Sequence, residues 1–226
     1  MVDLILSGQP ATLVTTVVIL ILSAALAALL TKKYLKTKSR AHLYWSIGLW
    51  LFAVGVLQEV AFALNYYPEW LIDAYLLIVV VLVEFLALGS MELTKTPWLK
   101  KAFGAFVILA TLYTVYTLVT SNTALVQNPY LSADSTLGPP ITDYVFTGPI
   151  PLSVAVSSSI ATFAAAIVLA VVALKSYIKT RNKKLLSIVV GVVVVSVAGT
   201  LWLVEYPALL YIAEFVGILL LWIGFI

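Results

Sequence analysis

Three glutamates lie within long apolar stretches of the sequence and are its clearest candidates for chemistry. Glu59, Glu84 and Glu214 share their stretches with no Lys or Arg. A carboxylate without a basic partner is costly to hold among lipid chains, so it is expected to take up a proton. A carboxyl group that binds and releases a proton is what a proton relay or a proton-coupled transporter requires. The alternative is a permanently protonated glutamate that only links two helices by a hydrogen bond.

The helical rise separates these three glutamates by depth. At 1.5 Å per residue, Glu84 lies about 21 Å and Glu214 about 12 Å from the start of its stretch. Glu59 stands near the end of its stretch, so we expect it to lie at the membrane interface and to reach water. Glu84 and Glu214 are therefore the primary candidates for a shared pathway, and Glu59 is the weaker one.

Neutral polar residues provide further candidates. Tyr113, Tyr116 and Thr117 recur at helical spacing within one apolar stretch, and the sequence leaves open whether they line a polar crevice or pack against another helix. The serines at 157–159 stand beside several alanines, a composition typical of close helix packing. His42 is the only histidine and cysteine is absent, which excludes thiolate sites and multi-histidine metal sites. We expect no metal and no cofactor.

The elements that must position these residues are membrane helices. Of the 226 residues, 63% are hydrophobic and 10% are charged, whereas a soluble domain is about half apolar and about a quarter charged. A soluble enzyme, a secreted domain and a disordered protein are therefore excluded. We expect an all-α integral membrane protein, one domain over residues 1–226 with seven transmembrane helices of about 20 residues or more. The apolar runs cover residues 11–31, 42–64, 70–93, 98–120, 150–175, 184–204 and 206–226.

Basic residues orient the expected helices. All thirteen Lys and Arg fall within residues 32–40, 95–101 and 175–184, which connect the helices on one side of the membrane. Cytoplasmic connections carry an excess of Lys and Arg, so we expect a multi-pass cell-membrane protein with an extracytoplasmic N-terminus and a cytoplasmic C-terminus. Residues 121–149 then form an extracytoplasmic loop that caps the bundle. The basic connections are expected to touch anionic lipid headgroups and not nucleic acid.

The sequence also carries an internal similarity at an offset of 143 residues. Residues 34–39 (YLKTKS) match residues 177–182 (YIKTRN), and Gly48 matches Gly191. The first three expected helices thus correspond to the last three in the same orientation, with the fourth as a linker. This is a parallel 3+1+3 arrangement, a kind of internal symmetry known from transporters. It places the two deep glutamates, Glu84 and Glu214, on corresponding helices. The alternative is convergence between basic connections that join apolar helices.

In topology, the chain resembles the broad group of seven-helix proteins that includes the SWEET and PQ-loop proteins and the rhodopsins. The resemblance covers the whole chain but rests only on the pattern of helices. The Pro-Gln dipeptide expected of PQ-loop proteins does not occur in the sequence. The last expected helix contains no lysine, and no other span has one at mid-depth, so a retinal Schiff base cannot form. A photoreceptor is therefore set aside.

The sequence indicates a function only in outline. The 3+1+3 pattern and the deep carboxyl groups favour a small-solute or proton-coupled transporter. An accessory or structural subunit of a larger membrane complex is the second interpretation, and a seven-helix sensor with an output domain beyond Ile226 is the third. Enzyme chemistry is not expected, because no phosphate-binding loop, nucleophile elbow or metal-binding helix motif occurs. A membrane-protein partner or a second copy of the chain is compatible with these interpretations.

Overall fold

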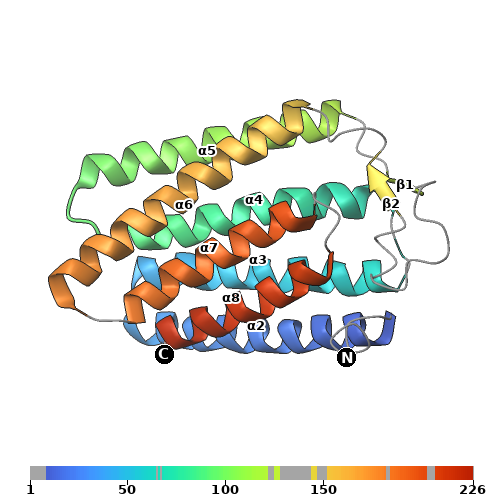
Figure 1. Ribbon diagram of the computed structural model, residues 1–226. Helices are drawn as coiled ribbons and strands as arrows, with labels where there is room; N and C mark the ends of the chain where they lie inside the picture. The colour runs from blue at the N-terminus through green and yellow to red at the C-terminus, as the bar shows by residue number, and fades with distance from the viewer. Residues whose placement is uncertain are drawn as a thin grey trace.

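The apolar stretches fold as seven helices that run alternately in opposite directions beside one another (Figure 1). The computed structural model describes residues 9–64, 66, 68–121, 125–127, 144–146, 152–181, 184–202 and 207–225. The helices are α2 (Gln9–Thr37), α3 (Arg40–Ala63), α4 (Glu69–Met91), α5 (Pro97–Thr120), α6 (Leu152–Thr180), α7 (Lys184–Trp202) and α8 (Pro207–Phe225).

Each expected span contains a helix, but two helices are longer than the hydropathy predicts. α2 and α6 continue through residues 32–37 and 175–180, which the charge pattern alone assigns to connections. Lysine has a high helix propensity, so basic residues prolong a helix beyond the apolar run. Five described helices are long and apolar enough to cross a membrane, by length and composition, which indicates a membrane protein. These spans are Leu13–Thr37, Arg40–Phe62, Trp70–Met91, Pro97–Thr120 and Val156–Thr180.

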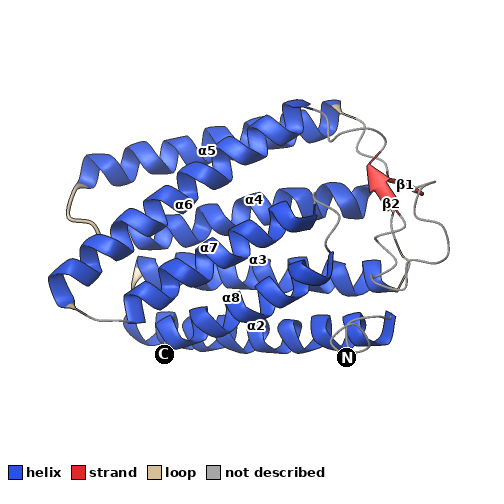
Figure 2. Cartoon of the chain, in the orientation of Figure 1, coloured by secondary structure: helices blue, strands red, loops and turns tan. Residues whose placement is uncertain are grey.

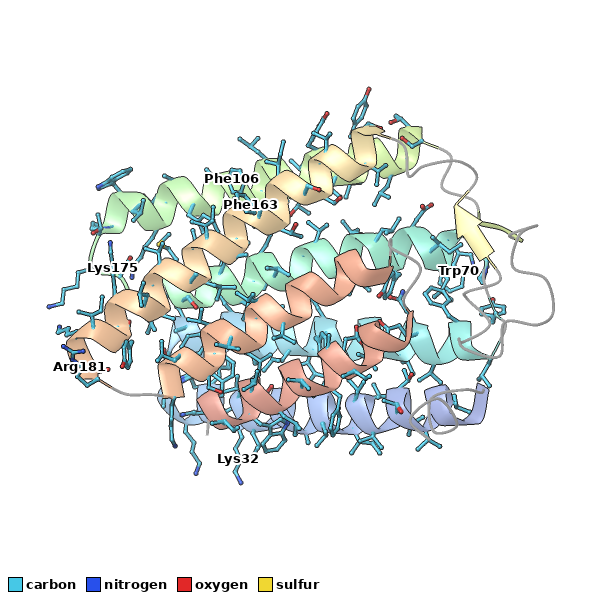
Figure 3. The ribbon with its side chains drawn as sticks, viewed as in Figure 1. Lys32, Trp70, Phe106, Phe163, Lys175 and Arg181 are labelled. Carbon is cyan, nitrogen blue, oxygen red and sulfur yellow. The ribbon has the colours of Figure 1, made fainter. Side chains whose placement is uncertain are left out.

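The connections that carry the basic residues lie at one end of the bundle. The α2–α3, α4–α5 and α6–α7 connections are at the left in Figure 1. Figure 3 shows Lys32, Lys175 and Arg181 at this end, which we call the basic end, and Trp70 at the opposite, distal end. Alternating helix directions explain the arrangement, since every second connection returns to the same end.

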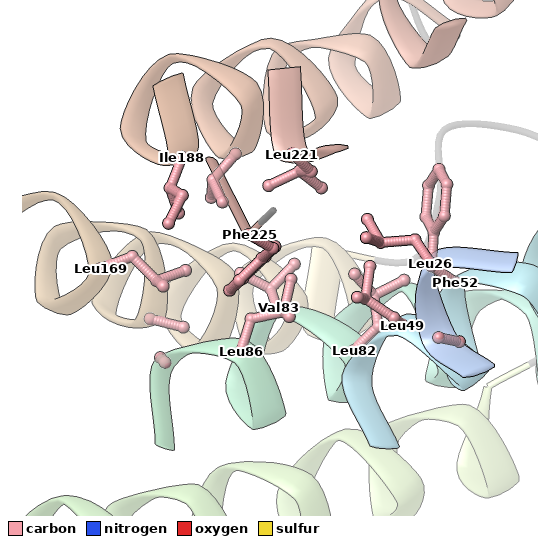
Figure 4. Close-up of a cluster of buried hydrophobic side chains, with 14 of the residues drawn as sticks. Leu26, Leu49, Phe52, Leu82, Val83, Leu86, Leu169, Ile188, Leu221 and Phe225 are labelled. Carbon is pink, nitrogen blue, oxygen red and sulfur yellow. The ribbon is translucent and has the colours of Figure 1, made fainter. Parts of the chain in front are cut away.

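All seven helices contribute side chains to one apolar core, part of which is shown in Figure 4. Leu26 of α2, Leu49 of α3 and Ile218 of α8 are among its fully buried side chains. α5 packs against α4 and α6 at the edge of the bundle and contributes Phe103 and Val107 to this core. Its outer face exposes large apolar side chains, a surface that suits lipid and not water. They include Ile108, Leu109, Leu112 and Val119.

Small side chains bring α6 close to α4. Ser157, Ala161 and Ala165 recur every four residues along α6, so they lie on one face of the helix, and all three are buried. α6 contacts α4 as well as its neighbours in sequence. The packing interpretation is confirmed for this buried face, whereas Ser159 is exposed.

The ends of α2 and α6 have the same local structure. Each helix has 29 residues, and the two begin and end 143 positions apart. Lys38 and Arg181, which follow them, have φ angles of 54° and 56°. Their backbone N–H groups donate to the carbonyls of Tyr34 and Tyr177, at 2.7 Å in each case. This is a left-handed C-cap, and the sequence similarity at this offset therefore corresponds to a repeated backbone turn.

Matching glycines also bring the next two helices of each half together. A Cβ atom on Gly48 of α3 would lie 3.0 Å from the carbonyl oxygen of Leu82 on α4. A Cβ atom on Gly191 of α7 would lie 3.1 Å from the carbonyl oxygen of Gly217 on α8. Both pairs of helices thus approach closely at a position where any larger residue would meet backbone.

A second pair of contacts fixes the relative register of these helices. Toward the basic end, Trp45 of α3 contacts Gly89 of α4, and Ile188 of α7 contacts Gly224 of α8. The contacting positions of α3 and α7 differ by 143, whereas those of α4 and α8 differ by 135 (224 − 89). The α4 and α8 contacts are therefore related by an offset eight residues smaller than the offset of 143 that relates the α3 and α7 contacts.

Two short strands stand at the distal end, outside the helices (Figure 2). β1 (Leu125–Gln127) pairs with β2 (Tyr144–Phe146) in antiparallel fashion, with Val126 opposite Val145. This ribbon is an addition to the expected all-α fold, and its valine and aromatic residues favour strands. The other residues of 122–149 lie outside the described residues, as does the expected cap over the bundle.

Candidate functional site

Glu59 of α3 and Glu214 of α8 meet inside the bundle. Their side chains are 4% and 5% exposed, and their carboxyl groups lie close enough to interact directly. Two ionised carboxylates repel each other strongly at a buried site, so we expect at least one of the two groups to hold a proton. We call these two residues the carboxyl pair.

Tyr75 of α4 is the third member of the site. Its hydroxyl donates a hydrogen bond to Glu59 Oε1, with 2.8 Å between the oxygen atoms. The Tyr75 ring packs edge-on against Phe62 of α3, with ring centroids 5.5 Å apart. The aromatic contact orients the hydroxyl, so the carboxyl pair is held by three helices.

Buried polar atoms around the pair lack other partners. Within the described residues, Oε2 of Glu59 and Oε2 of Glu214 have no hydrogen-bond partner, and the same is true of Oε1 of Gln58, the residue before Glu59. Buried polar groups are normally satisfied, and each exception calls for an explanation. The arrangement supports exchange of a proton between two carboxyl groups.

The path of α8 positions the carboxyl pair. α8 runs antiparallel to α3, and at the basic end the rings of Trp45 and Phe225 join the same two helices with centroids 5.1 Å apart. Trp222 Nε1 donates to the carbonyl of Leu22 on α2 at 3.0 Å. α8 is therefore fixed to the first half at its basic end, and the carboxyl pair forms the contact toward its distal end.

The expectation that Glu59 reaches water at the interface is wrong. Glu59 does lie near the distal end of α3, but its side chain is buried against α8 and α4. Depth along a helix does not determine whether a side chain faces a neighbouring helix or the surroundings. That direction depends on how the helices pack.

Glu84 has a different environment from the carboxyl pair. It is fully buried, and Thr111 Oγ1 of α5 donates to its Oε2 at 2.7 Å. Its Oε1 atom and Thr114 Oγ1, one turn farther along α5, have no hydrogen-bond partner within the described residues. Thr117 and Ser157 share a hydrogen bond of 3.0 Å between α5 and α6. These groups form a polar seam along α5, typical of hydrogen-bonded helix packing in membranes.

The structure does not bring Glu84 and Glu214 together. Glu84 faces α5, whereas Glu214 faces α3. The two residues lie on corresponding helices of the two halves, but the packing offset of 135 matches Glu214 with Val79 and Glu84 with Leu219. The carboxyl pair therefore belongs to the contact between the halves and is not itself a repeated feature.

The structure does not place Tyr113, Tyr116 and Thr117 in one common environment. Thr117 is buried, but Tyr113 and Tyr116 are 49% and 63% exposed on the outside of α5. Adjacent residues are about 100° apart around a helix, so Tyr116 and Thr117 point in different directions. Helical spacing alone does not show where the buried face of α5 ends.

Sequence reasoning does not identify Tyr75 and Thr111 as the hydroxyl donors to the buried glutamates. The available signal is their residue type, because hydroxyl side chains in membrane helices often hydrogen-bond to another helix. Which carboxyl group each one reaches depends on the packing of α4 against α3 and of α5 against α4.

Comparisons of the chain with protein-family models, with curated proteins and with solved structures found no match. The described residues contain no group of three or more His, Asp or Glu that could hold a metal ion. The function is therefore inferred from the carboxyl pair and from the helices that hold it.

Proposed function

We propose that this chain is a multi-pass membrane transporter in which the carboxyl pair binds and releases a proton during the movement of a small solute. The observation that carries the proposal is the direct approach of Glu59 and Glu214, two buried carboxyl groups from different halves of the chain. Buried acids in membrane helices mark proton and ion pathways. A shared proton gives this contact two chemical states.

The two states differ in how strongly they hold α8 against α3. With its proton, the pair is joined by a hydrogen bond. When the proton leaves, two carboxylates face each other at a buried site, where like charges repel strongly. The repulsion separates the halves at the distal end and admits water. A proton that binds from this water restores the hydrogen bond and closes the contact, so one proton leaves and one returns in each cycle.

Two parallel halves, α2–α4 and α6–α8, supply the moving parts, and α5 links them. The repeated C-caps of α2 and α6 and the matching glycine contacts support this 3+1+3 interpretation. In transporters built from repeats, alternating access is largely the rocking of one repeat against the other. A contact between halves that depends on a proton is suited to control such a movement.

The proposed orientation places the basic end in the cytoplasm. All thirteen Lys and Arg lie in residues 32–40, 95–101 and 175–184, the three segments that connect helices at the basic end. This one-sided distribution supports seven spans with the N-terminus and residues 121–149 outside the cell. The carboxyl pair then lies in the outer half of the membrane. In the proposed cycle the pair takes up its proton from the extracytoplasmic side and releases it toward the cytoplasm, so that each cycle carries one proton across the membrane.

Proton flux into proteoliposomes tests this function. The protein is reconstituted in liposomes that contain a pH-sensitive dye, a pH gradient is imposed, and a panel of sugars, amino acids and organic acids is added in turn. We expect Glu214→Gln and Glu59→Gln each to abolish solute-dependent flux, because glutamine keeps a hydrogen bond but releases no proton. Glu84→Gln is the matched control, since it changes a buried glutamate outside the pair and should leave the flux intact.

Two results would contradict the proposal. Flux that is unchanged in folded Glu59→Gln and Glu214→Gln variants would remove the carboxyl pair from proton chemistry. Absence of flux in the unmodified protein with every solute would favour the accessory-subunit interpretation, in which the pair only joins helices.

A further inference from the structure

A groove at the basic end lies between the α4–α5 connection and α6. Its volume is about 420 Å³. Along α6 it is lined by Ile167, Val171, Lys175 and Lys179, which recur every four residues and so occupy one face of the helix. Lys95 in the α4–α5 connection also lines it. One part of the groove is therefore apolar and the other part is basic.

The basic part of the groove has an uncompensated positive charge. The acidic residue nearest to Lys95 in sequence is Glu92, and Lys100 already pairs with it at 3.0 Å. Within the described part of the chain, no ion pair joins Lys95, Lys175 or Lys179 to a carboxylate. Thr96 and Ser176, which carry hydroxyl groups, line the groove together with these three lysines. Such a set of donors is complementary to a phosphate group.

The apolar part of the groove continues from the lysines toward the middle of the bundle. Ile167 and Val171 are 47% and 43% exposed, so the apolar face of α6 is open to a neighbouring molecule. Twelve residues separate Ile167 from Lys179, which corresponds to about 18 Å along the helix. One leaflet contributes about 15 Å of hydrocarbon. The groove thus matches a phosphate and the acyl chain attached to it.

We propose that this groove is a specific binding site for an anionic phospholipid, with the phosphate on Lys95, Lys175 and Lys179 and an acyl chain along Ile167 and Val171 of α6. Basic pockets between membrane helices bind acidic headgroups in this way. A free phosphate ion would use the lysines but would leave the apolar half without a role. The inference concerns a different part of the protein from the carboxyl pair and is independent of proton transport.

The first half of the chain provides a matched control. Lys32 and Lys36 on α2 stand 143 positions before Lys175 and Lys179 and occupy the corresponding last turns of their helix. No residue of α2 lines the groove, which is formed by α6, the α4–α5 connection and the adjoining ends of α4 and α5. The two pairs of lysines therefore carry the same charge on similar helices, but only one pair belongs to the proposed site.

Native mass spectrometry of the purified protein tests the proposal. The protein is titrated with phosphatidylglycerol, phosphatidylcholine or inorganic phosphate, and bound lipid is counted. We expect one phosphatidylglycerol to bind in preference to phosphatidylcholine, and inorganic phosphate not to displace it. In the Lys175→Gln/Lys179→Gln variant the affinity should fall about 30-fold, from the loss of two charges near the headgroup. The Lys32→Gln/Lys36→Gln variant should bind as the unmodified protein does.

Three outcomes would overturn the assignment. Equal binding of phosphatidylcholine would show that charge plays no part, and an equal loss in the two double variants would show a general effect of net charge. Displacement of the lipid by inorganic phosphate, with the same dependence on Lys175 and Lys179, would assign the site to free phosphate. Thermal unfolding of each variant establishes that it is folded, and the lysines involved lie on exposed helix positions.

Discussion

Lys38 and Arg181 lie 143 residues apart and adopt the same left-handed backbone conformation, with φ angles of 54° and 56°. This conformation costs a residue with a side chain about 1 kcal/mol or more, so only glycine adopts it routinely. The ammonium group of Lys38 lies 5.6 Å from the centroid of the Tyr34 ring, a distance that permits a cation–π interaction. An uncommon conformation at matching positions relates the two halves more specifically than their shared hydropathy.

Glycine at either of these C-cap positions should stabilise the protein. Lys38→Gly and Arg181→Gly remove the unfavourable contact of Cβ with the backbone, and we expect each to raise the free energy of unfolding by about 0.5–1 kcal/mol. Unfolding by titration with SDS measures the change. The gain at Lys38 should be the smaller one, because its contact with Tyr34 is lost.

Lys36→Gly is the control for the C-cap prediction. Lys36 is exposed and lies within α2, where glycine lowers the free energy of unfolding by about 1 kcal/mol. Opposite signs at Lys36 and Lys38 would confirm the boundary of the helix. A loss of stability in both C-cap variants would contradict the left-handed caps.

The close approach of helices at Gly48 and Gly191 predicts that alanine is harmful at both positions. The new Cβ atom would stand 3.0 Å or 3.1 Å from a backbone carbonyl oxygen, which cannot move without shifting a helix. Overpacking of this kind costs about 1–3 kcal/mol, partly offset by the higher helix propensity of alanine. We expect each variant to lose about 1 kcal/mol in a chemical unfolding experiment.

Gly104→Ala provides the comparison for these glycines. A Cβ atom on Gly104 of α5 would meet no atom within 4 Å, so alanine should be neutral or should stabilise by up to about 1 kcal/mol. If Gly48→Ala and Gly191→Ala behaved like Gly104→Ala, the close contacts of α3 with α4 and of α7 with α8 would be wrong.

The environment of the carboxyl pair predicts that removing the Tyr75 hydroxyl and removing the Glu214 carboxyl group lower the free energy of unfolding by different amounts. Tyr75→Phe removes one hydroxyl donor but keeps the ring against Phe62, and hydrogen bonds between membrane helices average about 0.6 kcal/mol. Glu214→Leu leaves Glu59 buried without its carboxyl partner, which we expect to cost about 1–3 kcal/mol. Thermal unfolding in detergent compares the two variants.

Tyr113→Phe controls for the loss of a tyrosine hydroxyl, because Tyr113 lies on the outer face of α5. It should leave the unfolding temperature unchanged. A Glu214→Leu variant as stable as Tyr75→Phe would indicate that the two carboxyl groups do not depend on each other.

The proposed orientation predicts the reactivity of single cysteines. The chain has no cysteine of its own, so each introduced thiol reports on one position. Tyr66→Cys, at an exposed position between α3 and α4, should react in intact cells with a reagent that cannot cross the membrane. Lys36→Cys should react only after the membrane is opened. The reverse pattern would show that the orientation is inverted. Reaction at both positions in intact cells would contradict the prediction that α3, which lies between them, crosses the membrane.

The sequence by itself determined the helices, their order and the end of the bundle that carries the basic residues. Apolar length and charge are local properties, and a helix satisfies its own backbone hydrogen bonds, so these features need no knowledge of neighbouring helices. The similarity between residues 34–39 and 177–182 likewise survives as a repeated C-cap, because a cap is formed by consecutive residues.

Only the tertiary structure decided which polar groups meet. The place of Glu59 near the end of its helix predicts contact with water, but the side chain instead meets Glu214, and Glu84 is paired with Thr111 on α5. Each of these contacts depends on the rotation of a helix about its axis and on its register against a neighbour. Those quantities come from glycine and side-chain packing between segments far apart in sequence, as at Gly191 and Gly217, and one residue of rotation turns a side chain through about 100°.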